Sequence, residues 1–410
     1  MYFPHISAKN AWDTEVCIIN TSSFQTLTGN LLAYNDAGVQ LSSTPISLTA
    51  NARRQFTVGS DFTSATSIGY MILESSSTDV CGYMKFYIAG SYRGAIPATM
   101  DVNSSDAYIP HIASNVTWST GLSLLNTTDS DKTLTIQFSN GTTKTVTLAA
   151  YQHDAFSIKS LFSGTSQPNI KSGVISNASG IVGLELFISN SGIGQYYLNG
   201  LLLKDDTTVD LYFPHIANFN TWWTGIVAYN PSSSTATLTI TPYQEDGTAL
   251  TVQTMEIQGN DKYIGNAEQL NCPSNAAWFH IASTQALSGF ELFGTNNHQQ
   301  LGGYTCVNIS VTSGVFPKIE KSGWTGIALV NIQSSSASVT LNAMKDDGTQ
   351  VATTSLSLDP HEKSVGSAQE LFTTDISEAT YISFSSTNPI VGFQLNGSTD
   401  NMLLDALPGM

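Results

Sequence analysis

Short runs in which apolar and polar side chains alternate recur along the whole chain. Residues 133–138 and 143–148 show this alternation on either side of Asn140-Gly141. A period of two places successive side chains on opposite faces of a strand, and Asn-Gly is the strongest short signal for a hairpin. The pattern therefore predicts two antiparallel strands joined by a tight turn.

The surrounding stretch predicts further strands at 120–126, 155–162, 173–176, 181–188 and 196–203. The apolar strand 181–188 has counterparts at 80–88, 287–293 and 390–395, each containing a glycine. No segment shows a convincing 3.6-residue period, so we expect no helices. Seven or eight short strands joined by turns are typical of an antiparallel β-sandwich.

One motif occurs four times: an aromatic-proline segment, then Trp, then Thr, then Asn six residues after the Thr. We expect this Asn to turn the chain by bonding its own backbone. The prolines of the motif, Pro4, Pro110, Pro214 and Pro317, stand 106, 104 and 103 residues apart. The chain is therefore predicted to be all-β, with four tandem antiparallel β-sandwich modules of immunoglobulin-like or jelly-roll-like type. Their predicted bounds are 1–107, 108–211, 212–314 and 315–410. Because the joins are short, we expect a semi-rigid rod or arc.

Several motifs carry a resemblance: Trp-x-Thr-Gly at 118–121 and 222–225, Asp-Gly or Asn-Gly hairpins, and Ala-Ile-Pro or Ala-Leu-Pro at 95–97 and 406–408. With them the chain resembles the tandem β-sandwich repeats of bacterial secreted and cell-surface proteins. Glu15 stands where the other modules have Gly, and the second and third modules lack the closing Ala-x-Pro. The resemblance implies an exported protein at the cell surface or outside the cell, and it implies no particular activity.

The formal net charge is −16, with only 15 basic residues, and 11% of the residues are charged. Such a surface repels nucleic acid and anionic membranes. Hydrophobic residues at 41% suffice for a core in each module. No apolar run approaches the 18 residues expected of a membrane-spanning helix. Met1 directly precedes the first repeat segment, so we expect this sequence to be a mature form.

The four cysteines fall two by two within modules. Cys17 and Cys81 belong to the first, Cys272 and Cys306 to the third. We predict disulfides within each pair, because bridged cysteines must have Cα atoms within about 7 Å. The alternative is four small buried thiols.

Five tryptophans of the repeated motif are the candidate binding residues, since flat rings stack on sugar faces. They are Trp12, Trp118, Trp222, Trp223 and Trp324. The alternative is that each ring caps the end of its own sandwich. Trp223 is the best candidate for exposure, because the third module carries two successive rings.

Metal binding, cofactor binding and catalysis are not expected. His5, His111 and His215 share one repeat position, but the fourth module has Lys318 there, which suggests a surface or a seam between modules. His153-Asp154 and His361-Glu362 read as solvated turns. No nucleophile elbow is found, and only a cleft between modules could join a distant Ser/His/Asp set.

The first motif segment, Tyr2, Phe3, Pro4, His5 and Ile6, is a candidate assembly strand. If such a segment completed the sheet of the preceding module, this one could add to the open edge of a neighbouring molecule and build a head-to-tail filament. The alternative is pairing within its own module. We expect an extracellular structural or interaction protein, whose partner is itself or a surface glycan or protein; the other hypothesis is a glycan-binding surface protein.

Overall fold

The computed structural model describes residues 1–190, 196–217, 221–296, 300–304 and 308–410. The chain divides into two compact units, Met1–Asp206 and Thr207–Met410. Each unit holds two β-sandwich modules, which we number 1 to 4 in chain order. The boundary between the units falls five residues before the predicted join at 211/212.

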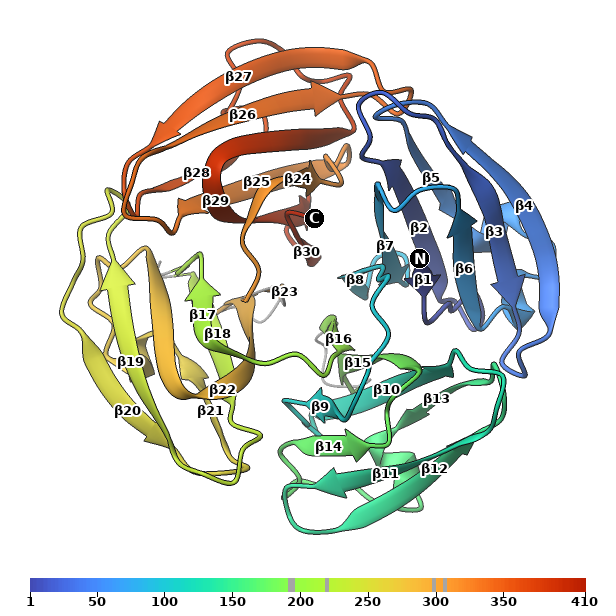
Figure 1. Cartoon of the computed structure of the whole chain (residues 1–410). Coiled ribbons are helices and arrows are strands. Elements are labelled where there is room, and N and C mark those ends of the chain that lie inside the picture. The colour runs from blue at the N-terminus through green and yellow to red at the C-terminus, as the bar shows by residue number, and fades with distance from the viewer. Residues whose placement is uncertain (191–195, 218–220, 297–299, 305–307) are drawn as a thin grey trace. The chain divides into compact units, whose positions relative to one another are not determined.

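Module 1 shows the architecture that all four modules share (Figure 1). One sheet has the order β1-β6-β3-β4 and the other β5-β2-β7-β8, so this sandwich consists of two four-stranded antiparallel sheets. Its strands are β1 (Tyr2–Phe3), β2 (Asp13–Asn20), β3 (Leu27–Tyr34), β4 (Gln40–Leu48), β5 (Arg53–Thr57), β6 (Tyr70–Ser75), β7 (Val80–Tyr87) and β8 (Arg93–Pro97). In immunoglobulin constant domains, by contrast, the first, second, fifth and fourth strands share a sheet.

Module 2 repeats this order in the sheets β9-β14-β11-β12 and β13-β10-β15-β16. The predicted hairpin is confirmed, since Thr133 pairs with Thr147 and Gln137 with Thr143. Its strands are β9 (Ala107–Ile109), β10 (Trp118–Asn126), β11 (Lys132–Phe138), β12 (Thr143–Leu148), β13 (His153–Ser157), β14 (Gly173–Ser176), β15 (Ile181–Ser189) and β16 (Leu198–Leu203).

Modules 3 and 4 keep the same pairing but fuse the sixth and seventh strands. β22 (Trp278–Thr295) and β29 (Tyr381–Ser398) each run through both sheets of their sandwich. The remaining strands are β17 (Thr208–Phe213), β18 (Trp222–Tyr229), β19 (Ala236–Tyr243), β20 (Gln253–Ile257), β21 (Lys262–Asn266) and β23 (Leu301–Tyr304) in module 3. In module 4 they are β24 (Val311–Phe316), β25 (Gly323–Asn331), β26 (Ala337–Met344), β27 (Gln350–Leu358), β28 (Lys363–Ser367) and β30 (Leu404–Pro408).

The expectation of no helix is wrong in detail. One helical turn, α2 (Ile158–Leu161), interrupts the predicted strand 155–162 after β13, and α1 (Val58–Asp61) occupies the same place in module 1. Two 3-10 turns, η1 (Ala65–Ser67) and η2 (Glu268–Leu270), complete the helical elements of the described residues. A single turn is too short to show a 3.6-residue period. None of the described helices is long and apolar enough to cross a membrane.

The Asn of the repeated motif holds the second strand of each sandwich to the turn between the fourth and fifth strands. The Asn331 Nδ2 donates to the carbonyl oxygens of Ser335, Leu358 and Asp359 at 2.9, 3.2 and 2.9 Å. Its Oδ1 accepts the backbone N–H of Gln333 at 3.1 Å. Equivalent bonds are made by Asn20, Asn126 and Asn230. The predicted bond from this Asn to its own backbone is therefore confirmed in all four modules.

Candidate functional site at the module seams

Within each unit the core of the first module extends into the second module, which also has a core of its own. The core of module 1 continues into Leu184 and Leu198 of module 2. The core of module 3 continues into Phe393, Leu395 and Leu404 of module 4. Phe293 and Phe393 stack across the second seam with their ring centroids 5.3 Å apart. Burial of apolar surface therefore holds the modules together in pairs.

Each seam is also bridged by a hairpin turn that reaches the next module. In unit 1 the backbone oxygen of Asp36 accepts the His153 N–H at 2.9 Å, and in unit 2 that of Glu245 accepts the Lys363 N–H at 2.8 Å. Gly38 has φ +78°, and a Cβ there would lie 2.7 Å from the Tyr151 carbonyl oxygen. Glycine is thus required both by the left-handed backbone and by the close approach of the next module.

His153 forms a polar cluster inside the first seam. Its Nδ1 lies 2.7 Å from the Asp36 Oδ1, and its Nε2 lies 2.8 Å from the Ser123 Oγ and 3.3 Å from the His5 Nδ1. The hydrogen bond from His153 holds the pKa of Asp36 below its usual range. Burial lowers the pKa of His5 to about 3, with a further contribution from His153. His5 is therefore neutral at physiological pH.

The three residues Ser123, His153 and Asp36 have the connectivity of a catalytic triad. Both Ser123 and His153 are only 2% exposed, however, and the Ser123 Oγ also lies 3.2 Å from the Pro4 carbonyl oxygen. A nucleophile must reach its substrate, and this hydroxyl is enclosed between two modules. The cluster therefore satisfies buried polar groups of the seam.

Lys363 takes the place of His153 in the second seam. Its Nζ lies 2.6 Å from the His215 Nδ1 and donates to the Ala277 carbonyl oxygen at 2.9 Å. Burial lowers the pKa of Lys363 to about 8, so the ammonium form persists at neutral pH. Burial and this neighbouring charge hold the pKa of His215 well below its usual range.

Glu291 is a fully buried carboxyl group beside this bridge. Burial raises its pKa well above the usual range, while Lys363 and the His215 backbone N–H oppose that effect. Neither carboxylate oxygen meets hydrogen-bond geometry within the described residues. In module 4 the equivalent side chain, Gln394, accepts the Lys318 backbone N–H on its Oε1 at 3.4 Å, and its Nε2 donates to the Lys318 carbonyl oxygen at 2.9 Å.

The interpretation of His153 as part of a solvated turn is wrong. One position of the repeat, opposite the residue that precedes the repeated Asn, is basic in all four modules. It is occupied by Arg53, His153, Lys262 and Lys363. Every module therefore carries a basic residue here, and His153 and Lys363 are buried at a seam. In module 4 the strand pairing puts Lys363, two residues after His361, at the position of His153, and this pairing is not visible in the turn sequences. The expected seam position is confirmed for His5 and His215.

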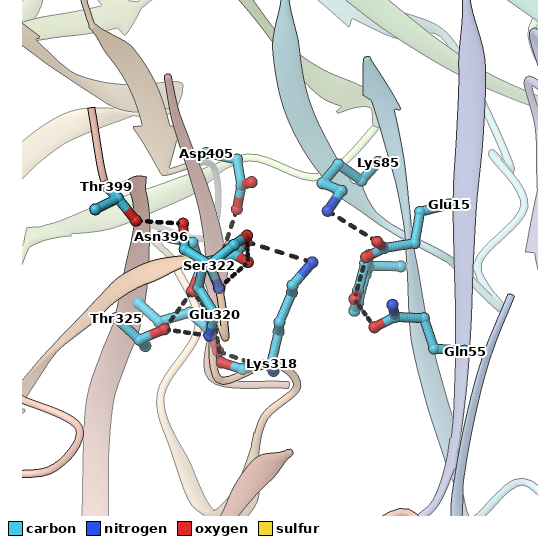
Figure 2. A network of polar contacts seen from close by, with 12 residues as sticks. Glu15, Gln55, Lys85, Lys318, Glu320, Ser322, Thr325, Asn396, Thr399 and Asp405 are labelled. Atoms are coloured by element: carbon cyan, nitrogen blue, oxygen red, sulfur yellow. Dashed lines mark hydrogen bonds and ion pairs between the residues drawn. The ribbon is translucent and has the colours of Figure 1, made fainter. Parts of the chain in front are cut away.

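Further buried polar networks lie in modules 1 and 4 (Figure 2). In module 1, Glu15 pairs with Lys85 at 2.9 Å and accepts the Tyr83 hydroxyl at 2.7 Å. The Glu that departs from the repeat pattern thus has a partner in the same sheet. In module 4, one ion pair and several hydrogen bonds connect Lys318, Glu320, Thr325, Gln394, Asn396 and Asp405.

The five candidate tryptophans are all partly buried, which agrees better with capping than with a fully exposed binding face. Trp118 stacks on Tyr197 with centroids 5.5 Å apart, and Trp12 lies 5.4 Å from the Tyr92 ring. Trp223 lies flat against Gly294, where an added Cβ would come within 2.2 Å of its ring. Its ring therefore covers the neighbouring strand.

Trp222 and Trp324 lie together at the second seam. They line a pocket of about 360 Å³ with His215 of module 3 and with Val365 and Phe393 of module 4. The other lining residues are Ala217, Gly326, Ile327, Ala328, Gly366, Ser367 and Leu395. The structure thus brings two of the predicted binding residues to one cavity.

The predicted disulfide between Cys17 and Cys81 is absent. The two residues lie on adjacent strands, where Cys17 pairs with Tyr83 and Cys81 with Ile19, so they face each other diagonally. Cys81 is a free thiol, and burial together with Cys17 raises its pKa. Cys272 is also a free thiol, and Cys306 lies outside the described residues.

The candidate assembly strand is paired within its own module. Tyr2 and Phe3 lie opposite Ile72 and Met71 of β6, and the Ile6 N–H donates to the Gly69 carbonyl oxygen at 2.8 Å. This is the alternative pairing stated above. Strand exchange between molecules would first have to break these bonds.

In the part of the chain that the structure describes, no group of three or more His, Cys, Asp or Glu side chains could hold a metal ion. The linker after module 1 is instead held by protein contacts. The Asn103 Nδ2 donates to the carbonyl oxygens of Ile181 and Leu203, and Asp205 accepts the backbone N–H groups of Ser104 and Ser105. This linker is therefore fixed to module 2.

No family model matches the chain, and no curated protein matches its sequence. Among solved structures, a chain from work on host cell surface retention of a 1.5-MDa bacterial ice-binding adhesin is 10% identical; the match covers 80% of this chain and 90% of that one, with a TM-score of 0.12. A triple jelly roll protein of an archaeal virus turret is 11% identical, covering 69% and 77%, with a TM-score of 0.16. A tetra-tandem repeat from the extending region of a large adhesion protein is 9% identical, covering 95% and 92%, with a TM-score of 0.12. Similarities at these scores carry no functional conclusion for this chain.

Proposed function

We propose that the chain is an extracellular structural or interaction protein, built as two stiff pairs of β-sandwich modules. The observation that supports this role best is the use of its buried polar residues: His153 and Lys363 bridge neighbouring modules inside closed seams. A continuous apolar core and a satisfied polar bridge both resist bending between modules. A spacer or scaffold needs this property.

A catalytic role has less support. Of the triad-like residues, Ser123 and His153 are enclosed, and the hydrogen bonds of His153 to Ser123 and Asp36 are used to join modules. A glycan-binding role also has less support, because the pocket beside Trp222 and Trp324 offers few polar groups for sugar hydroxyls. Sugar sites normally pair aromatic rings with several hydrogen-bonding side chains.

The purified full chain tests this proposal directly. We expect single-particle electron micrographs in which the modules of each pair keep a constant relative position, no saturable signal on a glycan array, and no turnover of glycosidase or peptidase substrates. Antibodies should label intact source cells without permeabilisation. Turnover of a substrate, or saturable glycan binding, would replace the scaffold by an enzyme or a lectin, and labelling only after permeabilisation would exclude the extracellular location.

A further inference from the structure

The pocket at the second seam has the chemistry of a ligand site. None of its lining residues is an Asp, Glu, Lys or Arg, and most of its wall is contributed by the rings of Trp222, Trp324 and Phe393 with aliphatic neighbours. Its volume of about 360 Å³ lies within the range of small-molecule pockets, which are mostly apolar with a few convergent polar groups. Val365 is 45% exposed, so the pocket opens to solvent beside it.

His215 supplies one polar group with a defined role. The Lys363 ammonium has only donors, so the His215 Nδ1, 2.6 Å away, must accept its hydrogen bond. The neutral imidazole then carries its proton on Nε2. This Nε2–H has no hydrogen-bond partner among the described residues, and His215 lines the pocket. The pocket therefore combines apolar walls with a hydrogen-bond donor on His215.

The Ser367 side chain of the wall already accepts a hydrogen bond from the protein. The Ser367 Oγ accepts the Glu370 N–H at 3.3 Å, and the Ser367 N–H donates to the Glu370 carboxylate at 2.8 Å. A charged ligand would lose its hydration without gaining an ion pair, because no charged side chain lines the cavity. A saccharide would leave most of its hydroxyls without partners.

We propose that this pocket binds an uncharged, planar aromatic group that carries one hydrogen-bond acceptor, with the ring against Trp222 and Trp324 and the acceptor on the His215 Nε2–H. Unit 1 provides the comparison: His5, the equivalent of His215, faces His153, and Trp12, the equivalent of Trp222, packs on Tyr92 with ring centroids 5.4 Å apart. Ser119 stands in module 2 where module 4 has Trp324. The site is therefore specific to the second pair of modules. It is independent of the proposed scaffold role, which requires no ligand.

The test uses acetophenone as probe and the indole N–H signals of the full chain as the NMR readout, with Trp222 and Trp324 assigned from W222F and W324F. Acetophenone should shift these two signals in a saturable manner. α-Methylstyrene, which has the same shape but no acceptor, should bind roughly fivefold more weakly, as expected for the loss of one hydrogen bond. Benzoate and a glucose trisaccharide should leave both signals in place.

Variants separate the donor from the shape of the pocket. His215→Phe should remove the preference for acetophenone over α-methylstyrene, and His215→Gln, which restores a donor near the Nε2 position, should recover it. Trp118→Phe, in the matching position of module 2, should leave binding unchanged. No saturable shift with acetophenone, equal affinity for both ring compounds in the unmodified chain, or shifts with benzoate or the trisaccharide would each overturn the proposal.

Discussion

The Nζ of Lys363 lies 2.6 Å from the Nδ1 of His215, although 148 residues separate them in the chain. In the first unit His5 and His153 are also 148 residues apart in the chain, and the His5 Nδ1 lies 3.3 Å from the His153 Nε2. Two basic positions of the repeat, one beside the motif proline and one opposite the residue before the motif Asn, therefore meet wherever two modules of a unit dock. One of the two must be neutral, and in both seams the residue beside the proline has the strongly lowered pKa.

Replacing His153 by alanine should weaken the first seam. The substitution leaves Asp36, Ser123 and His5 without their shared partner, and lost buried hydrogen bonds of this kind cost about 2–4 kcal/mol. Hydrogen-exchange mass spectrometry of the full chain should show reduced protection in β10 and β13. Asp154→Ala, one residue later and partly exposed, is the matched control and should change protection little. Equal effects of both variants would contradict the bridge.

The stability of unit 1 should fall as the pH is lowered from 7 to 5. The pKa of His5 is about 3 in the folded state and about 6.5 when unfolded, so below pH 6.5 the unfolded chain binds a proton that the folded chain does not. The stabilisation is complete above pH 6.5 and is lost progressively toward pH 3. The free energy of unfolding lost between pH 7 and pH 5 is roughly 1–2 kcal/mol.

Urea unfolding at pH 7 and pH 5 measures this effect. His5→Gln should unfold with a smaller difference between the two pH values than the unmodified chain. The charged and titratable neighbours of His5 are His153, Asp36 and Lys9. Asp36 has a lowered pKa and contributes with the same sign, but only near and below pH 4. An unchanged difference in the variant would show that His5 is already protonated or exposed in the folded state.

Asn331→Asp should destabilise module 4 by about 2–4 kcal/mol, because Nδ2 donates to three carbonyl oxygens and a carboxylate oxygen would repel them. Asn140→Asp is the control. Asn140 uses only its Oδ1, which accepts from the N–H and the hydroxyl of Thr142, and an aspartate keeps both bonds. Hydrogen exchange of β25 and β27 in Asn331→Asp, compared with that of β11 and β12 in Asn140→Asp, measures the difference. A small loss of protection in Asn331→Asp would show that the motif Asn only shapes its turn.

Cys81→Ala should leave the unfolding midpoint insensitive to reductant, as in the unmodified chain, because Cys81 is a free thiol. Loss of a native disulfide would cost about 2–5 kcal/mol instead. Its buried, high-pKa thiol should also react slowly with iodoacetamide in the folded protein and rapidly in urea. An increase in the mass of the intact protein on reduction would show that Cys17 and Cys81 form the predicted disulfide.

The sandwich, the repeat of four modules, the hairpin at Asn140-Gly141 and the backbone bond of the motif Asn could be predicted from the chain, since each depends on neighbours within one module. Period-two alternation decides locally which strand face is apolar, and Asn-Gly decides where a strand reverses. The helical turn at Ile158–Leu161 was missed because one turn has no measurable period. The predicted bridge between Cys17 and Cys81 was wrong because placing two thiols in one module does not settle their register across β2 and β7.

The contacts of the basic residues and tryptophans could not be predicted, because they arise where two modules dock. The sequence places His153 in a turn. Docking of modules 1 and 2 buries its side chain, and its Nδ1 contacts the carboxylate of Asp36, 117 residues away. Trp222 and Trp324 share a cavity because two separate modules meet there. Burial of a surface residue depends on what another module places over it, and this is a property of the docked pair that local alternation does not encode.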